Sequence, residues 1–116
     1  MYAYEIPGLR FSLPAGGAVA QHRFVSVANE AAIQATASTK VVGVSMNEVT
    51  AAELAKHESI VEIADGIVMV EAGGAVTSGA GVAADADGKA VAATGTAIGI
   101  AITAATAAGQ LIAVKL

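Results

Sequence analysis

This chain of 116 residues contains no cysteine and no tryptophan, and it has only two tyrosines and two phenylalanines. The lack of cysteine excludes a disulfide framework and thiolate metal sites. The scarcity of aromatic side chains leaves little material to line a ligand cavity. Basic residues are also few, with six Lys and Arg against ten Asp and Glu, for a net charge of −4. Because binding to phosphates needs clustered Lys and Arg, we expect no nucleic-acid partner.

Groups that could carry chemistry are sparse as well. The two histidines are His22 and His57, and His57 lies in the charged stretch Lys56-His57-Glu58, which is typical of a solvated helix end or loop. No serine lies in a Gly-x-Ser-x-Gly motif, so no nucleophile and base are paired locally. We therefore expect no catalytic residues, no cofactor and no small-molecule substrate.

The segment Asp85-Ala86-Asp87-Gly88 has a partial likeness to a calcium loop. In such a loop, however, glycine occupies the sixth position and glutamate the twelfth, whereas here glycine occupies the fourth and no glutamate follows. Since Asp and Gly adopt turn conformations at low cost, the segment predicts a hairpin turn rather than a metal site.

Alanine supplies most of the 55% hydrophobic content, and the length suits a single domain. Alanine side chains bury little area, so a core of Ala, Val and Ile leaves a monomer with a thin margin of stability. Contacts between subunits would add to that margin, and we expect the chain to oligomerise.

Short apolar runs at period two, separated by Gly or Asp-Gly, indicate strands and turns along most of the chain. We expect strands over 23–28, 32–35, 41–46, 59–64 and 67–71, followed by further strands to the end of the chain. Asp65-Gly66 predicts a tight hairpin between two of these strands. Thr50 and Glu53 have the spacing of a capping box, which predicts one short helix near residues 50 to 57.

Residues 90 to 114 carry no charge and include the GxxxG spacing Gly95-Thr96-Ala97-Ile98-Gly99, which raises the question of a membrane helix. The large residues Ile98, Ile100 and Ile102 alternate with small ones, and there is no aromatic belt or basic flank. We therefore predict strands here and no membrane partner. The first six residues lack the pattern of a signal peptide, so the product is expected to stay in the cytoplasm of the cell that makes it until lysis.

The two halves of the chain echo each other. Residues 32–36 before Val42-Gly43-Val44-Ser45 are similar to residues 90–94 before Ile98-Gly99-Ile100-Ala101. Each group leads through a small-residue loop to an apolar strand, 60–63 or 111–114. Gly43 and Gly99 lie at matching places, where a strand glycine usually marks a bulge or a close backbone approach. An internal duplication follows as a hypothesis.

The first twenty residues differ from the rest, since they hold both tyrosines and both prolines, Pro7 and Pro14. Proline cannot donate to a central ladder, so this segment is expected at a sheet edge or as an extended arm. A free arm with so much apolar surface needs a partner. It could fold back as an edge strand on its own domain or a neighbouring subunit, or it could add a strand to a binding partner. The candidate binding residues are Tyr2, Tyr4, Ile6, Leu9, Phe11 and Leu13.

The predicted fold is all-β: a small barrel or sandwich-like module of two related β-units, with an extended N-terminal arm and at most one short helix. Residues 1–20 form the arm and residues 21–116 the single β-rich domain.

The order of motifs from residue 40 to residue 116 resembles the capsid cement, or head decoration, proteins of tailed bacteriophages. The resemblance rests on six motifs: Gly43-Val44, Val68–Gly73, Ala75–Gly79, Asp85–Val91, Ile98–Ala101 and Ala107–Gly109. Members of that family are small β-rich modules that form trimers at three-fold and quasi-three-fold positions outside an icosahedral head. The resemblance implies a homotrimer on the outer surface of the virion, which binds the major capsid protein and clamps neighbouring capsomers against DNA pressure. It also implies an N-terminal arm that contacts the shell.

Two alternatives remain. The same strand pattern would serve another virion module, such as a head-fibre, tail or adhesin domain. A small ligand-binding or hydrolytic β-barrel would require convergent polar residues around an apolar cavity, which the composition makes difficult.

Overall fold

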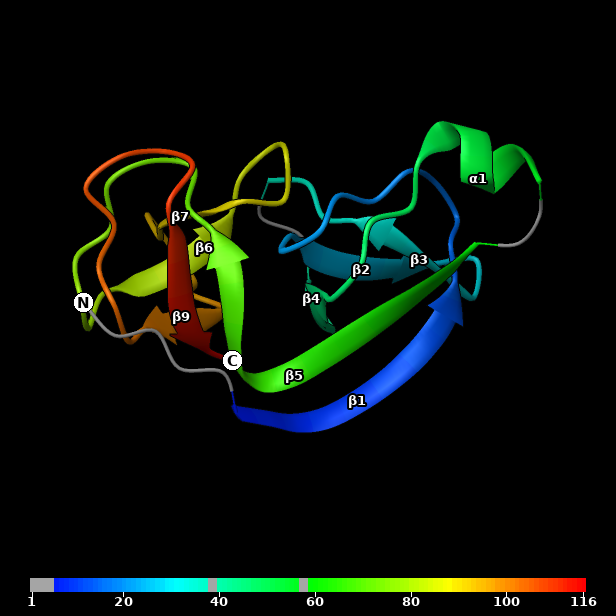
Figure 1. The fold of residues 1–116 in the computed structure, drawn as a ribbon. Coiled ribbons are helices and arrows are strands. Elements are labelled where there is room, and N and C mark those ends of the chain that lie inside the picture. Colours follow the sequence, from blue (N-terminus) through cyan, green and yellow to red (C-terminus); the bar gives the residue numbers. More distant parts are fainter. Residues whose placement is uncertain (1–5, 38–39, 57–58) are drawn as a thin grey trace.

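The computed structural model describes residues 6–37, 40–56 and 59–116 of the chain. Strands dominate this part of the chain, as the period-two pattern predicts, and one short helix interrupts them (Figure 1). The elements are β1 (Ile6–Pro14), β2 (Phe24–Ala28), β3 (Ala31–Gln34), β4 (Gly43–Ser45), α1 (Ala51–Ala55), β5 (Ile60–Glu71), β6 (Gly81–Ala84), β7 (Ala90–Ala92), β8 (Gly99–Ala101) and β9 (Leu111–Lys115).

The described strands form one curled antiparallel sheet in the order β3-β2-β4-β5-β9-β8-β6-β7, and β1 pairs with β5 beside this path. The predicted all-β class with a single short helix is confirmed. Residues 90 to 114 include β7, β8 and most of β9, joined by loops. The GxxxG stretch is a turn that leads into β8 at Gly99, as predicted, and not a helix. No helix in residues 6–37, 40–56 or 59–116 is long and apolar enough to span a membrane.

The predicted hairpin at Asp65-Gly66 is wrong, because β5 runs through both residues as one strand of 12 residues. The two halves of β5 have different partners: β1 pairs with residues 60–67 and β4 with residues 63–64, whereas β9 pairs with residues 67–71. Gly66 has a φ of 105°, which bends the strand between these partners. On the neighbouring strand the register shifts between Pro7 and Leu9, and this bulge follows the bend.

The chain consists of two units with the same topology. The first unit comprises β1 to β4, α1 and residues 60–65 of β5, and the second comprises residues 67–71 of β5 and β6 to β9. In the first unit β2 pairs with β3 and β4, and β4 pairs with β5; in the second, β6 pairs with β7 and β8, and β8 pairs with β9. The pairing of β1 with the first half of β5 is likewise repeated by the pairing of the second half of β5 with β9. The hypothesis of an internal duplication is confirmed.

The connections after the first strand of each unit are also equivalent. Residues 15–19 and 72–76 share the sequence Ala-Gly-Gly-Ala-Val. Ala15 bridges to Ala32 in the first unit, as Ala72 bridges to Ala90 in the second. This repeat of five identical residues is visible in the sequence alone and supports the duplication.

Gly43 and Gly99 occupy equivalent positions at the starts of β4 and β8. A Cβ on Gly43 would lie 2.5 Å from the carbonyl oxygen of Ala64, and one on Gly99 would lie 2.7 Å from the carbonyl oxygen of Lys115. Each glycine therefore allows its strand to approach the neighbouring strand closely, as the matching sequence positions predict.

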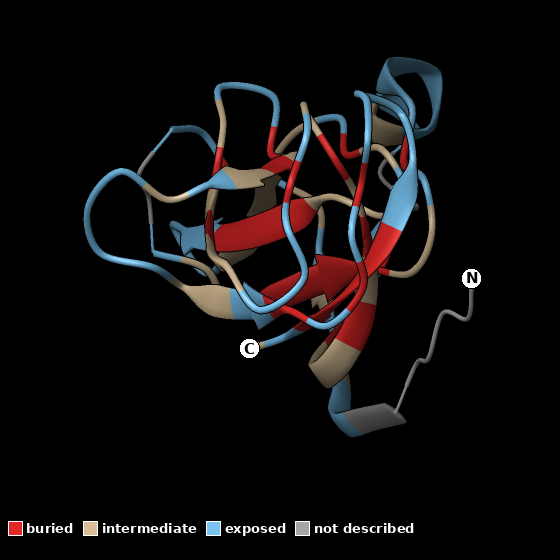
Figure 2. Cartoon of the chain, turned by 90° about the vertical axis from the view of Figure 1, so that its left-hand side faces the viewer, coloured by how far each residue is buried: buried red, intermediate tan, exposed pale blue. Residues whose placement is uncertain are grey.

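Each unit has its own core, and the cores match residue for residue. The first cluster is built on Val19, Val25, Ala32, Val49, Val61 and Ile63. Their equivalents Val76, Val82, Ala90, Ala105, Ile112 and Val114 all belong to the second cluster. That second cluster also takes in four residues from the first unit, namely Phe24, Ala35, Val44 and Ala64, so the second unit buries one face of the first. Figure 2 shows the buried residues along the strands and the exposed ones mainly in the loops.

Helix α1 is the main departure from the repeat. The Thr50 side chain accepts a hydrogen bond from the Glu53 N–H, and a Glu53 carboxylate oxygen accepts one from the Thr50 N–H, which confirms the capping box. The helix buries none of its own residues. It projects from one end of the molecule (Figure 1), in a loop that is shorter in the second unit.

We predict that Gly43→Ala and Gly99→Ala each lower the free energy of unfolding by about 1–3 kcal/mol, because the added methyl group forces a backbone shift. Gly17→Ala is the matched control, since nothing lies within 4 Å of its added Cβ. Chemical denaturation of the three variants tests the comparison. Equal effects at positions 17, 43 and 99 would contradict the close-approach interpretation.

Candidate functional site

The candidate binding residues of the N-terminal segment lie partly in β1. Tyr2 and Tyr4 fall outside the described residues, and of Ile6 only the backbone is described, which pairs with Ile67. Phe11 and Leu13 are half-buried and pack against the core of the first unit. The backbone of residues 6–14 thus extends the sheet as a strand of the fold, while the boundary of a separate arm at residue 20 stays a prediction.

Leu9 is the most exposed of the large hydrophobic residues in the described chain, with 59% of its surface accessible. It follows the bulge in β1, where the register slips relative to Asp65. In the part of the chain that the structure describes, β1 has one strand partner, β5, and the strand lies along the outside of the molecule (Figure 1). The far edge of β1 therefore offers unpaired backbone groups next to an exposed leucine, which is a surface suited to strand addition.

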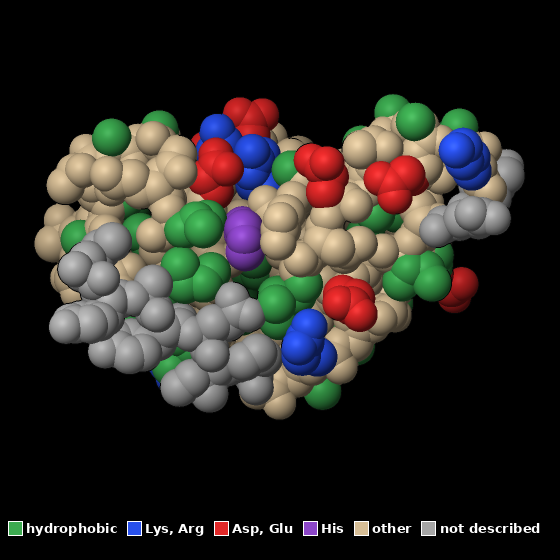
Figure 3. All heavy atoms as spheres, in the orientation of Figure 1, with side chains coloured by type: hydrophobic (Ala, Val, Ile, Leu, Met, Phe, Trp, Pro, Cys, Tyr) green, Lys and Arg blue, Asp and Glu red, His purple; other side chains and the backbone are tan. Residues whose placement is uncertain are grey.

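A polar cluster joins the two units at a second place. The Glu71 carboxylate lies 3.1 Å from the Lys89 ammonium and 3.6 Å from the Arg23 guanidinium. Arg23 Nη1 and Gln34 Nε2 both donate to the carbonyl oxygen of Asp87, at 3.0 and 2.8 Å. Figure 3 shows acidic and basic side chains gathered at this junction, with a histidine below them.

The segment Asp85–Gly88 is the hairpin turn that the sequence predicts, since it joins the paired strands β6 and β7. A carboxylate oxygen of Asp85 accepts hydrogen bonds from the N–H groups of Asp87 and Lys89, which closes the turn. The carbonyl of Gly88 accepts from the Phe24 N–H at 2.8 Å and so docks the turn on the first unit. The turn is therefore also a structural contact between the two units.

His22 is the one histidine within the described residues, and it belongs to no cluster there that could hold a metal ion. His57 lies outside the described residues. The His22 N–H donates to the carbonyl of Ser45, and the His22 carbonyl accepts from the Glu71 N–H, so its backbone helps to join the units. No group of three or more His, Asp or Glu side chains in residues 6–37, 40–56 and 59–116 is placed to hold a metal ion.

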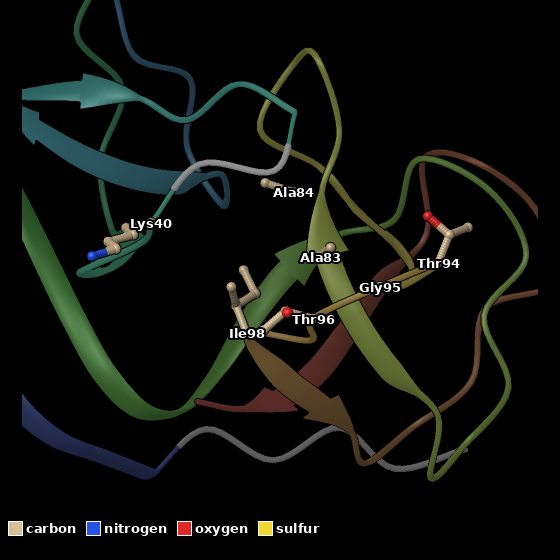
Figure 4. Close-up of a pocket in the computed structure, with 7 residues that line it drawn as sticks. All are labelled: Lys40, Ala83, Ala84, Thr94, Gly95, Thr96 and Ile98. Atoms are coloured by element: carbon tan, nitrogen blue, oxygen red, sulfur yellow. The ribbon is translucent and has the colours of Figure 1, made fainter.

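A shallow pocket of about 380 Å³ lies between the loop before β4 and the β6–β8 region. Its lining consists of Lys40, Ala83, Ala84, Thr94, Gly95, Thr96 and Ile98 (Figure 4). These are mostly small aliphatic and hydroxyl side chains, and the lining holds no acid and no histidine. Lys40 is the one ionisable group of this lining, and no carboxylate or imidazole there could activate the hydroxyl groups of Thr94 and Thr96.

The chain thus presents edges and surfaces on a rigid β-scaffold, which defines a structural or binding module. The model of the phage cement protein family matches residues 6–116, so the chain belongs to that family. Membership makes it a structural protein of a phage virion, and the resemblance noted in the sequence is confirmed.

One solved structure with the same fold is described as the head fiber gp8.5 N base of bacteriophage phi29. The two structures align with a TM-score of 0.73 at 20% identity, over 93% of this chain and 92% of that chain. At this identity the likeness shows the fold. No curated protein matches the chain in sequence.

We predict that Glu71→Ala lowers the free energy of unfolding by about 1–2 kcal/mol, because it leaves two cations of a partly buried cluster without their counter-charge. The Glu71 side chain is 26% exposed. Glu62→Ala is the control, since Glu62 pairs with Arg10 at a site 59% exposed, where an ion pair contributes about 0–1 kcal/mol. Denaturation of both variants at low and high salt measures the difference. A larger loss for Glu62→Ala would overturn the assignment of the junction to Glu71.

Proposed function

We propose that this protein binds the outer surface of an icosahedral phage head at three-fold and quasi-three-fold positions, as a homotrimer on the major capsid protein. There it clamps adjacent capsomers against the pressure of packaged DNA, and it carries no catalytic role. Membership of the cement family is the observation that carries this proposal. Three modest contacts in one trimer would combine into tight binding through effective concentration.

The N-terminal segment is the proposed contact with the shell. Phe11 and Leu13 hold β1 on the core of the first unit, while Leu9 projects to solvent. Tyr2, Tyr4 and Ile6 would continue this surface beyond the bulge. The open edge of β1 would supply main-chain hydrogen bonds to an extended segment of the capsid protein, and the large side chains would fill pockets on it.

A second candidate function follows from the head-fibre likeness. The similar structure is described as the base of a head fibre, and the present chain aligns over almost its whole length. The chain would then serve as a platform on the head from which a further structure rises. The same attachment to the shell serves both functions.

Reconstructions of particles assembled with and without the protein test the position. We expect extra density, about one small domain per subunit, at three-fold and quasi-three-fold positions. Density at two-fold or five-fold positions would contradict the proposal, and density that continues outward into a fibre would favour the platform function.

Binding to empty expanded heads tests the contact. We expect deletion of residues 1–5 and the change Leu9→Lys each to weaken binding at least tenfold, with the melting temperature unchanged within a few degrees, because both leave the pairing of β1 with β5 in place. Val42→Lys is the control, since Val42 is an exposed aliphatic residue outside β1. Unchanged binding of the Leu9 variant, or an equal loss for the Val42 variant, would exclude β1 as the contact.

A further inference from the structure

The second unit exposes an apolar face to solvent, whereas the equivalent face of the first unit is covered. Ile100 lies opposite Lys115 across β8 and β9, and alternate residues of a strand share a face. This free face therefore carries Ile100, Ile102, Leu111, Ala113 and Lys115, of which Ala113 is buried and the other four are exposed. A hollow of about 340 Å³ lies on it, lined by residues 97–100 with Lys115 and Leu116.

The corresponding residues of the first unit lie inside the molecule. Val44 pairs with Phe24 and Ala64 as Ile100 pairs with Gly81 and Lys115, so Val44 and Ile100 are equivalent. Val44 is 0% exposed, because the second unit covers it, whereas Ile100 is 50% exposed. The face that is covered in one unit is thus uncovered in the other.

At the other end of the molecule the first unit is exposed where the second unit is buried. Ala84 at the end of β6 is 4% exposed within the cluster that joins the units, and its turn docks on the first unit through Gly88. Its equivalent Val27, paired with Ala32 as Ala84 is paired with Ala90, is 46% exposed. The turn after Val27 is formed by Asn29 and Glu30, both with positive φ, and both are exposed.

The two units therefore pack through unlike surfaces, as in a head-to-tail repeat, and are not related by a two-fold axis. A stack of repeats with open ends normally carries polar caps, since an apolar end face would otherwise bind another molecule. Here one end presents Ile100 and the other presents Val27. Figure 1 places β8 and the β2–β3 turn at opposite ends of the molecule, whose longest extent is 40 Å.

The charges at the two ends are opposite. Lys115 lies on the free face and Glu30 on the β2–β3 turn, and neither takes part in an ion pair within the described residues. Contact between two copies of the free face would bring two lysines together. Contact between the free face and the β2–β3 turn would instead bring opposite charges together, which favours the unlike pairing.

We propose that copies of this chain associate head to tail: the β2–β3 turn of one copy, with Val27 and Glu30, packs on the free face of the next copy around Ile100 and Lys115. The number of copies, three, rests on the proposed function, whereas the contact itself rests on the asymmetry of the two units. Glu30 occupies the turn position that Gly88 holds in the second unit, where a Cβ would lie 3.1 Å from the Ala35 carbonyl oxygen, so the contact between copies differs in detail from the one within the chain.

Disulfide trapping of the free protein tests this contact without any capsid, so its outcome is independent of head binding. The chain has no cysteine, and single variants Val27→Cys and Ile100→Cys can be prepared separately. Under mild oxidation we expect a mixture of the two to form linked dimers, and Ile100→Cys alone to form none. Ile60→Cys mixed with Val27→Cys is the matched control, because Ile60 is 57% exposed, close to the 50% of Ile100, but lies on the first unit.

Self-linking of Ile100→Cys, absence of links in the mixture, or equal linking of the Ile60 control would each overturn the proposal. Charge reversal supplies a second measurement, in which Lys115→Glu and Glu30→Lys should each reduce linking severalfold and their combination should restore it. A chain carrying both cysteines then counts the copies. Products that stop at three support the trimer, and products that continue beyond three keep the contact but exclude a trimeric ring.

Discussion

The continuity of β5 through Gly66 is the constraint on which the rest of the structure depends. One strand serves as the last strand of the first unit and the first strand of the second, so the two units share one continuous sheet. The positive φ of Gly66 turns the strand from one set of partners to the next. The Glu71 ion pairs and the docking of Gly88 on Phe24 then hold the units at that angle. The surfaces available for binding follow from this arrangement.

A core of Val, Ile and Ala buries little area per residue, and the structure compensates by repetition. The same packing arrangement occurs twice, and the second unit adds one face of the first to its own core. Close approaches at Gly43 and Gly99 bring neighbouring strands together in both units. The result is a scaffold with small pockets and long strand edges.

The two units share a topology but have different exposed surfaces. The first unit carries the open edge of β1, the exposed Leu9 and the projecting helix α1. The second carries the free face around Ile100. Both units share one topology, and the residue equivalent to Ile100 in the first unit, Val44, is buried. The topology alone therefore does not require residues at this position to be exposed. The proposed contacts, one with the shell and one between copies, assign a partner to each of these surfaces.

Local signals in the sequence determined most strands, the capped helix at Thr50 and Glu53, and the turn at Asp85–Gly88. Alternation, capping and turn chemistry act between neighbouring residues, so a short segment is enough to show them. The matching positions of Gly43 and Gly99 were also visible in the sequence. The sequence also held the family resemblance and an exact repeat at residues 15–19 and 72–76. Asp65-Gly66 shows where local reasoning ends, since the same dipeptide serves a hairpin or a bend, and the partners of β5 decide between them. Tertiary structure alone placed Glu71 between Arg23 and Lys89 and left Ile100 open while it covered Val44. These outcomes depend on which distant strands pair, and that choice is made by the free energy of the whole fold rather than by any short segment.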